Sequence, residues 1–285
     1  MKQILIISGK GGTGKTVLAG AFACLSESKV MVDSDVDAAN LYLLLNPVVI
    51  EEHEFRSGKT AIINKDICIK CGQCLSVCRF GAIKKDFTIE SFSCEGCALC
   101  SFICPCKAID MEENISGHWF VSETKYGLFV HAKLGIAEEN SGKLVAKIRQ
   151  EAKALAEKTK VDYVIIDGPP GIGCPVMASM SGIDLAVVVT EPTLAGLHDA
   201  KRVIETARHF NVKTTLVINK YDLNLDVTKE IEKYCKDIGV PVIGKIDFDE
   251  NVVKAMVIGK NIVEYVDNKT TQEIKQIWKI LKEEI

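Results

Sequence analysis

The chain has 285 residues, of which 47% are hydrophobic and 26% charged, and its formal net charge at pH 7 is −3. This composition is typical of one large α/β domain, or of a medium domain joined to a small one. The slightly negative charge argues against nucleic acid as a partner, because phosphate backbones attract proteins with a basic surplus. No apolar run approaches the length of a membrane span, and the first residues form a strand before a glycine loop, unlike a signal peptide. We therefore expect a cytoplasmic protein for which membrane binding is disfavoured.

Predicted strands and helices alternate along most of the chain. Short apolar runs rich in β-branched residues predict strands, and the stretches between most of them predict helices. The predicted strands cover residues 3–8, 29–33, 163–167, 185–189, 214–219 and 240–244, and the predicted helices cover 15–28, 142–158, 196–210 and 226–238. Strands that are apolar on both faces and alternate with helices indicate an α/β fold, with a mainly parallel sheet covered by helices on both faces.

The segment GKGGTGKT lies between the first predicted strand and the first predicted helix. It fits the P-loop pattern G-x-x-x-x-G-K-[ST], in which backbone N–H groups converge on phosphate oxygens at the positive end of a helix. Within this loop we expect Lys15 to hold the β- and γ-phosphates and Thr16 to bind Mg²⁺. The predicted nucleotide-binding residues of the loop are Gly9, Lys10, Gly11, Gly12, Thr13, Gly14, Lys15 and Thr16.

Two cysteine quartets interrupt the alternation of strands and helices. CIKCGQCLSVCRFGAI at residues 68–83 and CEGCALCSFICPCKAI at 94–109 match cysteine for cysteine and share an Ala-Ile ending. Each has the spacing C-x₂-C-x₂-C-x₃-C, in which three thiolates hold one [4Fe–4S] cluster and the fourth reaches the other cluster. Zinc is the alternative, although zinc ribbons bind through two separated pairs of ligands. The predicted ligands are Cys68, Cys71, Cys74 and Cys104 for the first cluster, and Cys94, Cys97, Cys100 and Cys78 for the second.

These patterns predict a discontinuous P-loop NTPase domain over residues 1–58 and 114–285, with an inserted ferredoxin-like domain over 59–113. The two quartets differ at one place: Arg79 follows the first quartet, whereas Pro105 follows the second. Proline would help to fix the turn but ligates nothing, so we expect the cluster to form without it.

Lys10, a second lysine at the start of the loop, resembles the deviant Walker A motif of the MinD/ParA/nitrogenase-iron-protein class of ATPases. In that class the extra lysine reaches across a nucleotide-sandwich dimer to the partner's phosphates. Asp33 and Asp35 resemble the family's D-x-D, whose first carboxylate lies near the metal and whose second orients the attacking water. Asp167 resembles the Walker B aspartate, which supports Mg²⁺ through water. The resemblance therefore implies ATP hydrolysis with Lys10, Lys15 and Asp35 as the catalytic residues.

Two further residues carry weaker resemblances. Asn219, in NKYD, is similar both to the N-K-x-D guanine reader of GTPases and to an asparagine that contacts adenine in the MinD-like class. We expect ATP as the nucleotide, and GTP stays open. Cys174, seven residues after Asp167, resembles a cluster-ligating cysteine of the nitrogenase iron protein; a buried structural cysteine is the alternative.

The whole layout resembles MinD-superfamily P-loop ATPases with an inserted ferredoxin domain. It implies a homodimer, formed in response to nucleotide, that contains two [4Fe–4S] clusters and hydrolyses ATP with Mg²⁺. Its nucleotide state would be coupled to electron transfer with a protein donor or acceptor, or to assembly or delivery of a metal cluster on a protein client. The alternatives are a redox carrier in which nucleotide only switches conformation, and a MinD-like spatial regulator.

Two expectations concern the remaining segments. The last helix is expected to pack against the sheet rather than to bind a membrane. Residues 137–149 place Ser141 before a helical run, as an N-cap or as part of a partner-facing loop. The apolar face of the last helix consists of Ile274, Ile277, Trp278, Leu281 and Ile285.

Overall fold

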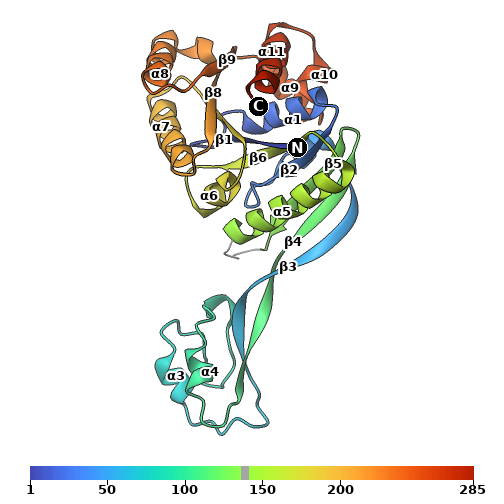
Figure 1. Ribbon diagram of the computed structural model, residues 1–285. Coiled ribbons are helices and arrows are strands. Elements are labelled where there is room, and N and C mark those ends of the chain that lie inside the picture. Colours follow the sequence, from blue (N-terminus) through green and yellow to red (C-terminus); the bar gives the residue numbers. More distant parts are fainter. Residues whose placement is uncertain (136–140) are drawn as a thin grey trace. The chain divides into compact units, whose positions relative to one another are not determined.

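The computed structural model describes residues 1–135 and 141–285 (Figure 1). Their strands form a nine-stranded sheet in the order β3-β4-β5-β2-β6-β1-β7-β8-β9. The strands are β1 (Lys2–Ser8), β2 (Lys29–Asp33), β3 (Val48–Ile63), β4 (Ile109–Thr124), β5 (Gly127–Leu134), β6 (Tyr163–Pro170), β7 (Leu185–Thr190), β8 (Lys213–Asn219) and β9 (Val242–Ile246).

The sheet is mixed and mostly parallel. The six strands from β2 to β9 in the sheet order pair in parallel, and β5 also pairs in parallel with β2. Only Lys125 and Tyr126 connect β4 to β5, and so short a connection joins antiparallel neighbours. The predicted, mainly parallel sheet is confirmed, and the six predicted strands correspond to β1, β2 and β6 to β9, although β9 lies two residues later than expected and β6 extends three residues further. The strands β3, β4 and β5 were not predicted.

The four helices predicted between strands are also confirmed, whereas the helix Cys174–Met180, between β6 and β7, was not predicted. The first ends at Leu25 rather than at residue 28, because Ser26 has an extended backbone with φ −93° and ψ 129°. The helices are α1 (Lys15–Leu25), α2 (Tyr42–Leu45), α3 (Gln73–Val77), α4 (Leu99–Phe102), α5 (Ser141–Thr159), α6 (Cys174–Met180), α7 (Leu194–His209), α8 (Leu225–Asp237), α9 (Glu250–Val257), α10 (Ile262–Tyr265) and α11 (Lys269–Glu284), with 3₁₀ turns at Ser91–Ser93 and Tyr221–Leu223.

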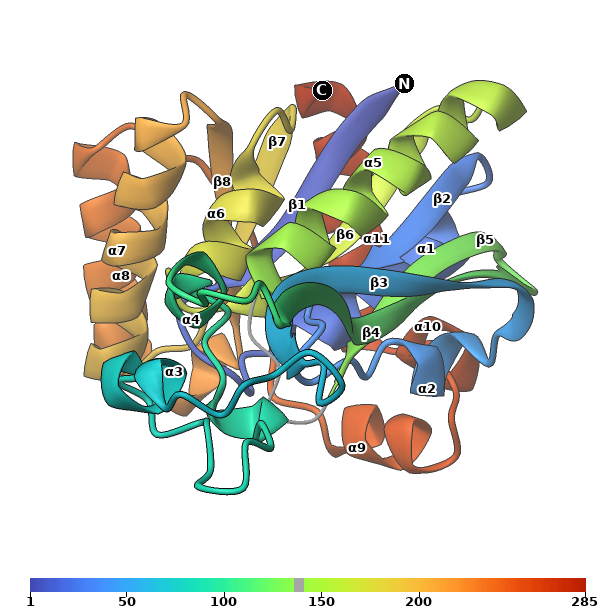
Figure 2. The same ribbon diagram turned by 90° about the horizontal axis from the view of Figure 1, so that it is seen from below.

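Helices cover both faces of the parallel strands (Figure 2). Ile4 and Ile6 of β1 share a core with residues of α1 and α11, in which the rings of Phe22 and Trp278 lie 5.0 Å apart. Leu5, which alternates with them along the strand and so faces the other side of the sheet, is also fully buried. Burial on both faces explains why these strands read as continuous apolar runs.

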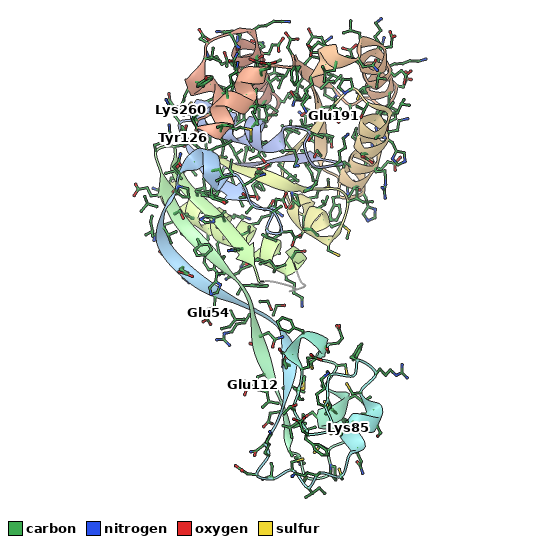
Figure 3. The ribbon with its side chains drawn as sticks, turned by 180° about the vertical axis from the view of Figure 1, so that it is seen from behind. Glu54, Lys85, Glu112, Tyr126, Glu191 and Lys260 are labelled. Carbon is green, nitrogen blue, oxygen red and sulfur yellow. The ribbon has the colours of Figure 1, made fainter. Side chains whose placement is uncertain are left out.

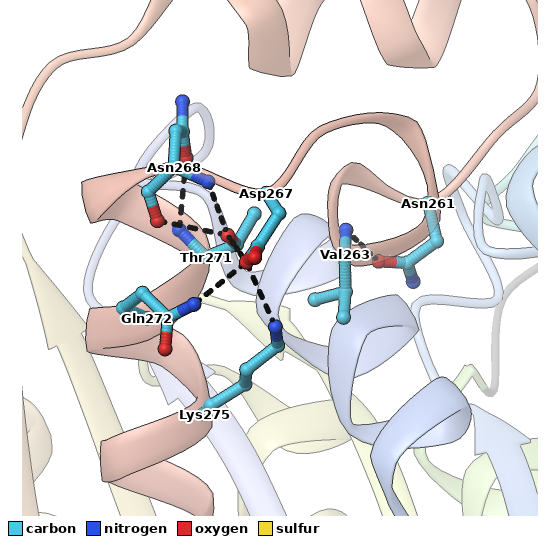
Figure 4. A network of polar contacts seen from close by, with 7 residues as sticks. All are labelled: Asn261, Val263, Asp267, Asn268, Thr271, Gln272 and Lys275. Carbon is cyan, nitrogen blue, oxygen red and sulfur yellow. Dashed lines mark hydrogen bonds and ion pairs between the residues drawn. The ribbon is translucent and has the colours of Figure 1, made fainter.

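The last helix, α11, packs as predicted: its apolar residues from Ile274 to Leu281 are buried in the core with α1 and β9. A capping box fixes its start, because Asn268 Oδ1 accepts from Thr271 N and Thr271 Oγ1 accepts from Asn268 N (Figure 4). Asp267 adds a contact with Lys275 Nζ at 3.0 Å. In the part of the chain that the structure describes, every helix is too short or too polar to cross a membrane.

The chain divides into two compact units, and each is described by itself below. Unit 1 consists of Met1–Glu52, Trp119–Lys133 and Ser141–Ile285, and unit 2 consists of His53–His118 with a short segment that begins at Leu134. The division falls inside β3 and β4, so unit 2 extends beyond the predicted insert of 59–113 at both ends. The residues 137–140, predicted as a cap or partner-facing loop, lie outside the described residues; α5 itself begins at Ser141.

Candidate functional site

The P-loop of unit 1 joins β1 to α1 and depends on two glycines. Gly12 and Gly14 have φ of 81° and 94°, in the left-handed region that side chains disfavour. A Cβ atom on Gly14 would lie 2.4 Å from Asn219 Nδ2, so the close approach of β8 also requires glycine there. The loop therefore ends at the N-terminus of α1, whose free N–H groups attract phosphate. Lys15, the first residue of α1, is only 6% exposed.

Residues at the end of β8 hold the loop from the side. Asn219 Nδ2 donates to the carbonyl of Thr13 at 2.8 Å, and Lys220 Nζ donates to that of Gly12 at 3.3 Å. The Asn219 amide nitrogen is thus bound to the loop backbone, and its role in base recognition stays a prediction. Asp222, the last residue of NKYD, accepts from Phe248 N at 2.7 Å through Oδ1.

Two predicted acidic residues of unit 1 lie side by side at or near the carboxyl ends of neighbouring strands. Asp33 of β2 and Asp167 of β6 are partners in the parallel register. Asp33 accepts from Asp35 N at 3.1 Å and from Leu41 N at 3.0 Å, so its carboxylate fixes the chain that follows β2. This edge of a parallel sheet is where α/β proteins bind ligands.

The Asp167 carboxylate is buried, and neither of its oxygens accepts a hydrogen bond of ordinary geometry. Burial raises the pKa of Asp167 to about 7, although the nearby Thr16 hydroxyl and Lys15 ammonium act to lower it. Burial and the charge of Asp167 likewise raise the pKa of Asp33 well above its usual value. A divalent cation supplies the charge that such carboxylates lack, so Thr16 and Asp167 fit a Mg²⁺ site.

Asp35 lies beside the same loop and is partly buried. Burial raises the pKa of its carboxyl group, and the Lys15 ammonium acts against this rise. Asp35 and Lys15, two of the three predicted catalytic residues, are therefore close enough to interact electrostatically. Asp35 and Lys15 come together because β2 and β1, which precede them, both pair with β6.

Lys10 forms a contact that the sequence did not predict. Its Nζ atom lies 2.5 Å from Glu191 Oε1, and Lys220 Nζ lies 3.5 Å from Glu191 Oε2. Glu191 follows β7, which pairs with β1 in the sheet. The one signal in the sequence that could have identified Glu191 is that it is a charged residue shortly after a predicted strand.

In unit 2 the two quartets repeat in backbone as well as in sequence. Helix α3 begins at Gln73 and α4 begins at Leu99, the equivalent position of the second repeat. Positive φ angles recur at three equivalent pairs, and the Ala-Ile ending of each repeat is buried. The pairs with positive φ are Lys70 and Gly96, Gly72 and Ala98, and Gly81 and Lys107.

The eight cysteines of these repeats line two hollows, four in each. The first quartet contributes three cysteines to one hollow and the second quartet contributes three to the other, and the fourth cysteine of each crosses over. One hollow is lined by Cys68, Cys71, Cys74 and Cys104, together with Cys106. The other is lined by Cys78, Cys94, Cys97 and Cys100. The structure brings together the two ligand sets that the spacing predicts.

Backbone N–H groups point at the fourth cysteine of each quartet. Ala108 N donates to Cys104 Sγ at 3.2 Å. Burial acts to raise the pKa of Cys78, but N–H groups of residues 80–83 outweigh it and lower the pKa. A thiolate stabilised in this way suits an iron ligand. The turn after Cys78 forms with an exposed Arg79 in place of proline.

The described residues contain no group of three or more His, Cys, Asp or Glu side chains arranged around a single metal ion. A [4Fe–4S] cluster spreads its four thiolates around a larger group, which the two four-cysteine hollows fit. Cys106 Sγ lies 3.8 Å from Cys104 Sγ, at the edge of one hollow. Cys174, the first residue of α6, is exposed rather than buried, so the structure does not support the structural alternative for it.

A glycine loop between a buried strand and a helix, with acidic residues at the ends of neighbouring parallel strands, defines a P-loop nucleotide-binding protein. The chain matches the family described as CobQ/CobB/MinD/ParA nucleotide binding domain over residues 4–262. It belongs to this family, and it is a P-loop ATPase of the MinD/ParA class.

Individual relatives agree with this membership. An uncharacterized protein of Methanocaldococcus jannaschii is 36% identical over 286 residues, which cover 99% of this chain and 96% of the relative. The septum site-determining protein MinD of Pyrococcus horikoshii, solved with Mg-ADP, has the same fold, with a TM-score of 0.60 at 17% identity over 98% of this chain and 95% of that one.

Two partial matches bear on the iron–sulfur part of the prediction. Pyruvate synthase subunit PorD of Methanothermobacter marburgensis is 37% identical over 77 residues, covering 25% of this chain and 95% of the subunit. The iron-sulfur cluster carrier protein of M. jannaschii is 30% identical over 139 residues, covering 44% of this chain and 48% of the carrier.

Proposed function

We propose that this ATPase is an iron–sulfur protein in which the nucleotide state controls electron transfer between two [4Fe–4S] clusters and a protein partner. One observation carries the proposal: a single chain combines the ATPase site of unit 1 with eight cysteines that line two four-cysteine hollows in unit 2. Bound there, the clusters would supply one-electron chemistry. The equivalent backbones of the two repeats support resident clusters of similar construction.

In unit 1 we assign the nucleotide chemistry to the residues of the loop and of the strand ends. The N–H groups at the start of α1 and the Lys15 ammonium would bind the phosphates, and Thr16 and Asp167 would hold Mg²⁺. The ion, when bound, neutralises phosphate charge. Asp35, beside Lys15, would orient the attacking water. We expect Asn219 to contact the adenine base, and for this reason we expect ATP to be the preferred nucleotide.

The proposed unit of function is a homodimer formed with ATP. Lys10 would reach the phosphates bound by the second copy and contribute positive charge where the transition state develops negative charge. Because each site would then need a residue from the other copy, hydrolysis would depend on dimer formation. The domain division proposed for this activity is a P-loop domain of residues 1–58 and 114–285 with an insert of 59–113.

The test is anaerobic hydrolysis of ATP and of GTP by the cluster-loaded protein, first oxidised and then reduced with dithionite. We expect ATP to be the better substrate and the rate to change with the redox state. Lys10→Ala should abolish the redox-dependent hydrolysis. Equal rates in the two redox states would contradict coupling between the clusters and the nucleotide site.

Cluster delivery to a protein client is the second candidate, because of the partial match to an iron-sulfur cluster carrier protein. The two candidates differ in the fate of iron. Electron transfer leaves the iron content of the protein unchanged after many turnovers, whereas delivery lowers it as an apoprotein acceptor gains a cluster.

The remaining alternatives are separated by two assays. A redox carrier in which nucleotide only switches conformation would keep its electron transfer in Lys10→Ala and Asp35→Ala, whereas an ATP-driven enzyme would lose it. A MinD-like spatial regulator would sediment with liposomes in the presence of ATP.

A further inference from the structure

Glu191, labelled in Figure 3, is a largely buried residue of unit 1. Its carboxylate contacts two lysines of the nucleotide site. Its Oε1 atom lies 2.5 Å from Lys10 Nζ, and its Oε2 atom lies 3.5 Å from Lys220 Nζ. Burial acts to raise the pKa of Glu191, but the two lysines outweigh it and lower the pKa. Its side chain is only 18% exposed, so water and salt screen these contacts less than those of a surface ion pair.

The backbone that carries Glu191 is fixed by the turn between β7 and α7. The carbonyl of Glu191 accepts from Thr193 N at 2.8 Å. Gly196 packs directly onto this carbonyl, because a Cβ atom there would lie 2.3 Å from the Glu191 oxygen. Gly196 is itself held by Thr190 and Thr193, whose hydroxyl groups bond its carbonyl and its N–H at 2.9 Å. The carboxylate is therefore presented to the loop from a rigid support.

Glu191 also connects two parts of the phosphate loop. Lys10 lies near the start of the loop, and Lys220, the second lysine on Glu191, donates to the carbonyl of Gly12 in its middle. Ser8 Oγ donates to the carbonyl of Lys10 at 2.6 Å, which fixes the Lys10 backbone at the end of β1. With its backbone held by Ser8 and its ammonium held by Glu191, Lys10 is directed toward its own chain.

We propose that Glu191 is a positioning residue that holds Lys10 in its own subunit and thereby sets how readily ATP drives dimerisation. This inference rests on the proposed function, in which Lys10 acts on nucleotide bound by a second copy. Lys10 must leave Glu191 to do so, and the free energy of breaking the ion pair opposes dimer formation. The γ-phosphate of ATP adds negative charge that competes with the carboxylate. ADP lacks this charge and competes less, so the contact helps to distinguish the two nucleotides.

The central experiment uses Glu191→Gln, which keeps the shape of the side chain and removes its charge. In sedimentation velocity with a slowly hydrolysed ATP analogue, the protein concentration at half-dimerisation should fall about fivefold in the variant. The change should vanish in Lys10→Ala, so that the double variant matches Lys10→Ala alone. With ADP, Glu191→Gln should increase dimer formation relative to wild type.

Glu264→Gln is the matched control. Glu264 forms an ion pair with Lys125 at 2.7 Å, and its side chain is 29% exposed, but it lies away from the phosphate loop. The control should leave the half-dimerisation concentration unchanged. A second readout needs no dimer: acetic anhydride should label Lys10 faster in Glu191→Gln than in wild type, relative to Lys2 of the same protein.

The outcomes separate the two levels of the argument. A wild-type chain that stays monomeric with ATP overturns the proposed dimer and, with it, the role of Glu191. A wild-type chain that dimerises at the same concentration as Glu191→Gln overturns the role of Glu191 alone. Equal labelling of Lys10 in both proteins overturns the contact on which that role depends.

Discussion

The two candidate sites differ in what holds their residues in place. In unit 1, Asp33, Asp167 and Asn219 are far apart in sequence, and each lies at or near the carboxyl end of a buried parallel strand. In unit 2, the cysteines fall within residues 68–104 and lie on short helices and turns. The apolar cluster beneath them is small and includes cysteines, with Cys74 among its buried members.

Because of this difference, we expect bound ligands to matter more for the folding of unit 2 than for the folding of unit 1. The nucleotide site of unit 1 is supported by an extensive core of aliphatic and aromatic side chains on both faces of the sheet. Unit 2 has few residues to bury, and small domains of this kind depend on bound metal for folding free energy. We therefore expect unit 1 to fold without its ligand and unit 2 to need its clusters.

Iron removal should produce the largest effect. After chelation of iron under reducing conditions, the amide hydrogens of α3 and α4 should exchange at least about 100-fold faster, because the clusters no longer hold the cysteines together. The amide hydrogens of β1 and β6 should exchange as before. Hydrogen exchange followed by mass spectrometry reads both units in one experiment, and protection of α3 without iron would remove the distinction between the units.

A substitution in the nucleotide site should affect unit 1 and leave unit 2 unchanged. Asp35→Asn should lower the rate of ATP hydrolysis about 100-fold, because a neutral amide accepts a hydrogen bond from the attacking water more weakly than a carboxylate does. The iron content and the cluster absorption should not change. Asp37→Asn is the matched control, since Asp37 is an exposed carboxylate two residues further on. A comparable loss in both variants would show that Asp35 has no particular place in the reaction.

The fold could be predicted from the sequence where a strand is buried on both faces of the sheet. The parallel strands are buried on both faces and read as apolar runs, and the glycine loop marks where the first one ends. The strand β3 was not predicted because most of its residues are exposed, from Val48 through the charged stretch that includes Glu52 and Glu54. It is an edge strand of the sheet, and such a strand lacks the apolar signature on which sequence reading depends.

The candidate sites were predictable where function depends on local spacing. The cysteine spacing predicted which four side chains share each hollow, and the glycine and lysine spacing predicted the phosphate loop. Glu191 was missed because it reaches Lys10 through the pairing of β1 with β7, which no local pattern encodes. The backbone contacts of Asn219 were missed for the same reason, since they depend on how closely β8 approaches the loop.

The crossover of cysteines between the quartets gives a prediction within unit 2. Cys78→Ser should reduce the iron content by about half, because Cys78 lines the hollow of the second quartet and serine is a poorer ligand than thiolate. Cys106→Ser should retain the full iron content, although Cys106 lies 3.8 Å from Cys104. Iron analysis and electron paramagnetic resonance of the reduced proteins distinguish the two variants. Loss of iron from Cys106→Ser would make Cys106 a ligand and revise the predicted set.

The smallest effect concerns the core of unit 1, at a histidine beside the nucleotide site. His131 of β5 is the register partner of Asp33, and its ring stacks on Phe129 with centroids 4.6 Å apart. Its Nε2 atom lies 3.0 Å from Ser122 Oγ. Burial lowers the pKa of His131 to about 4, whereas an unfolded chain has a histidine pKa of about 6.5. Between these values the unfolded state binds the proton and the folded state does not.

The contribution of His131 to the free energy of unfolding of unit 1 should therefore fall as the pH is lowered from about 6.5 to about 4. His131→Gln should remove a part of this pH dependence on the order of 2 kcal/mol, because glutamine can still contact Ser122 but does not titrate. Trp119 and Trp278, the two tryptophans of the chain, both belong to unit 1, so their fluorescence during urea unfolding reports that unit. Asp167, whose raised pKa acts in the opposite direction, cancels in the difference between variant and wild type. If the pH dependence were the same in both proteins, protons would reach His131 in the folded state, and the core beside Asp33 would be more open to water than its packing indicates.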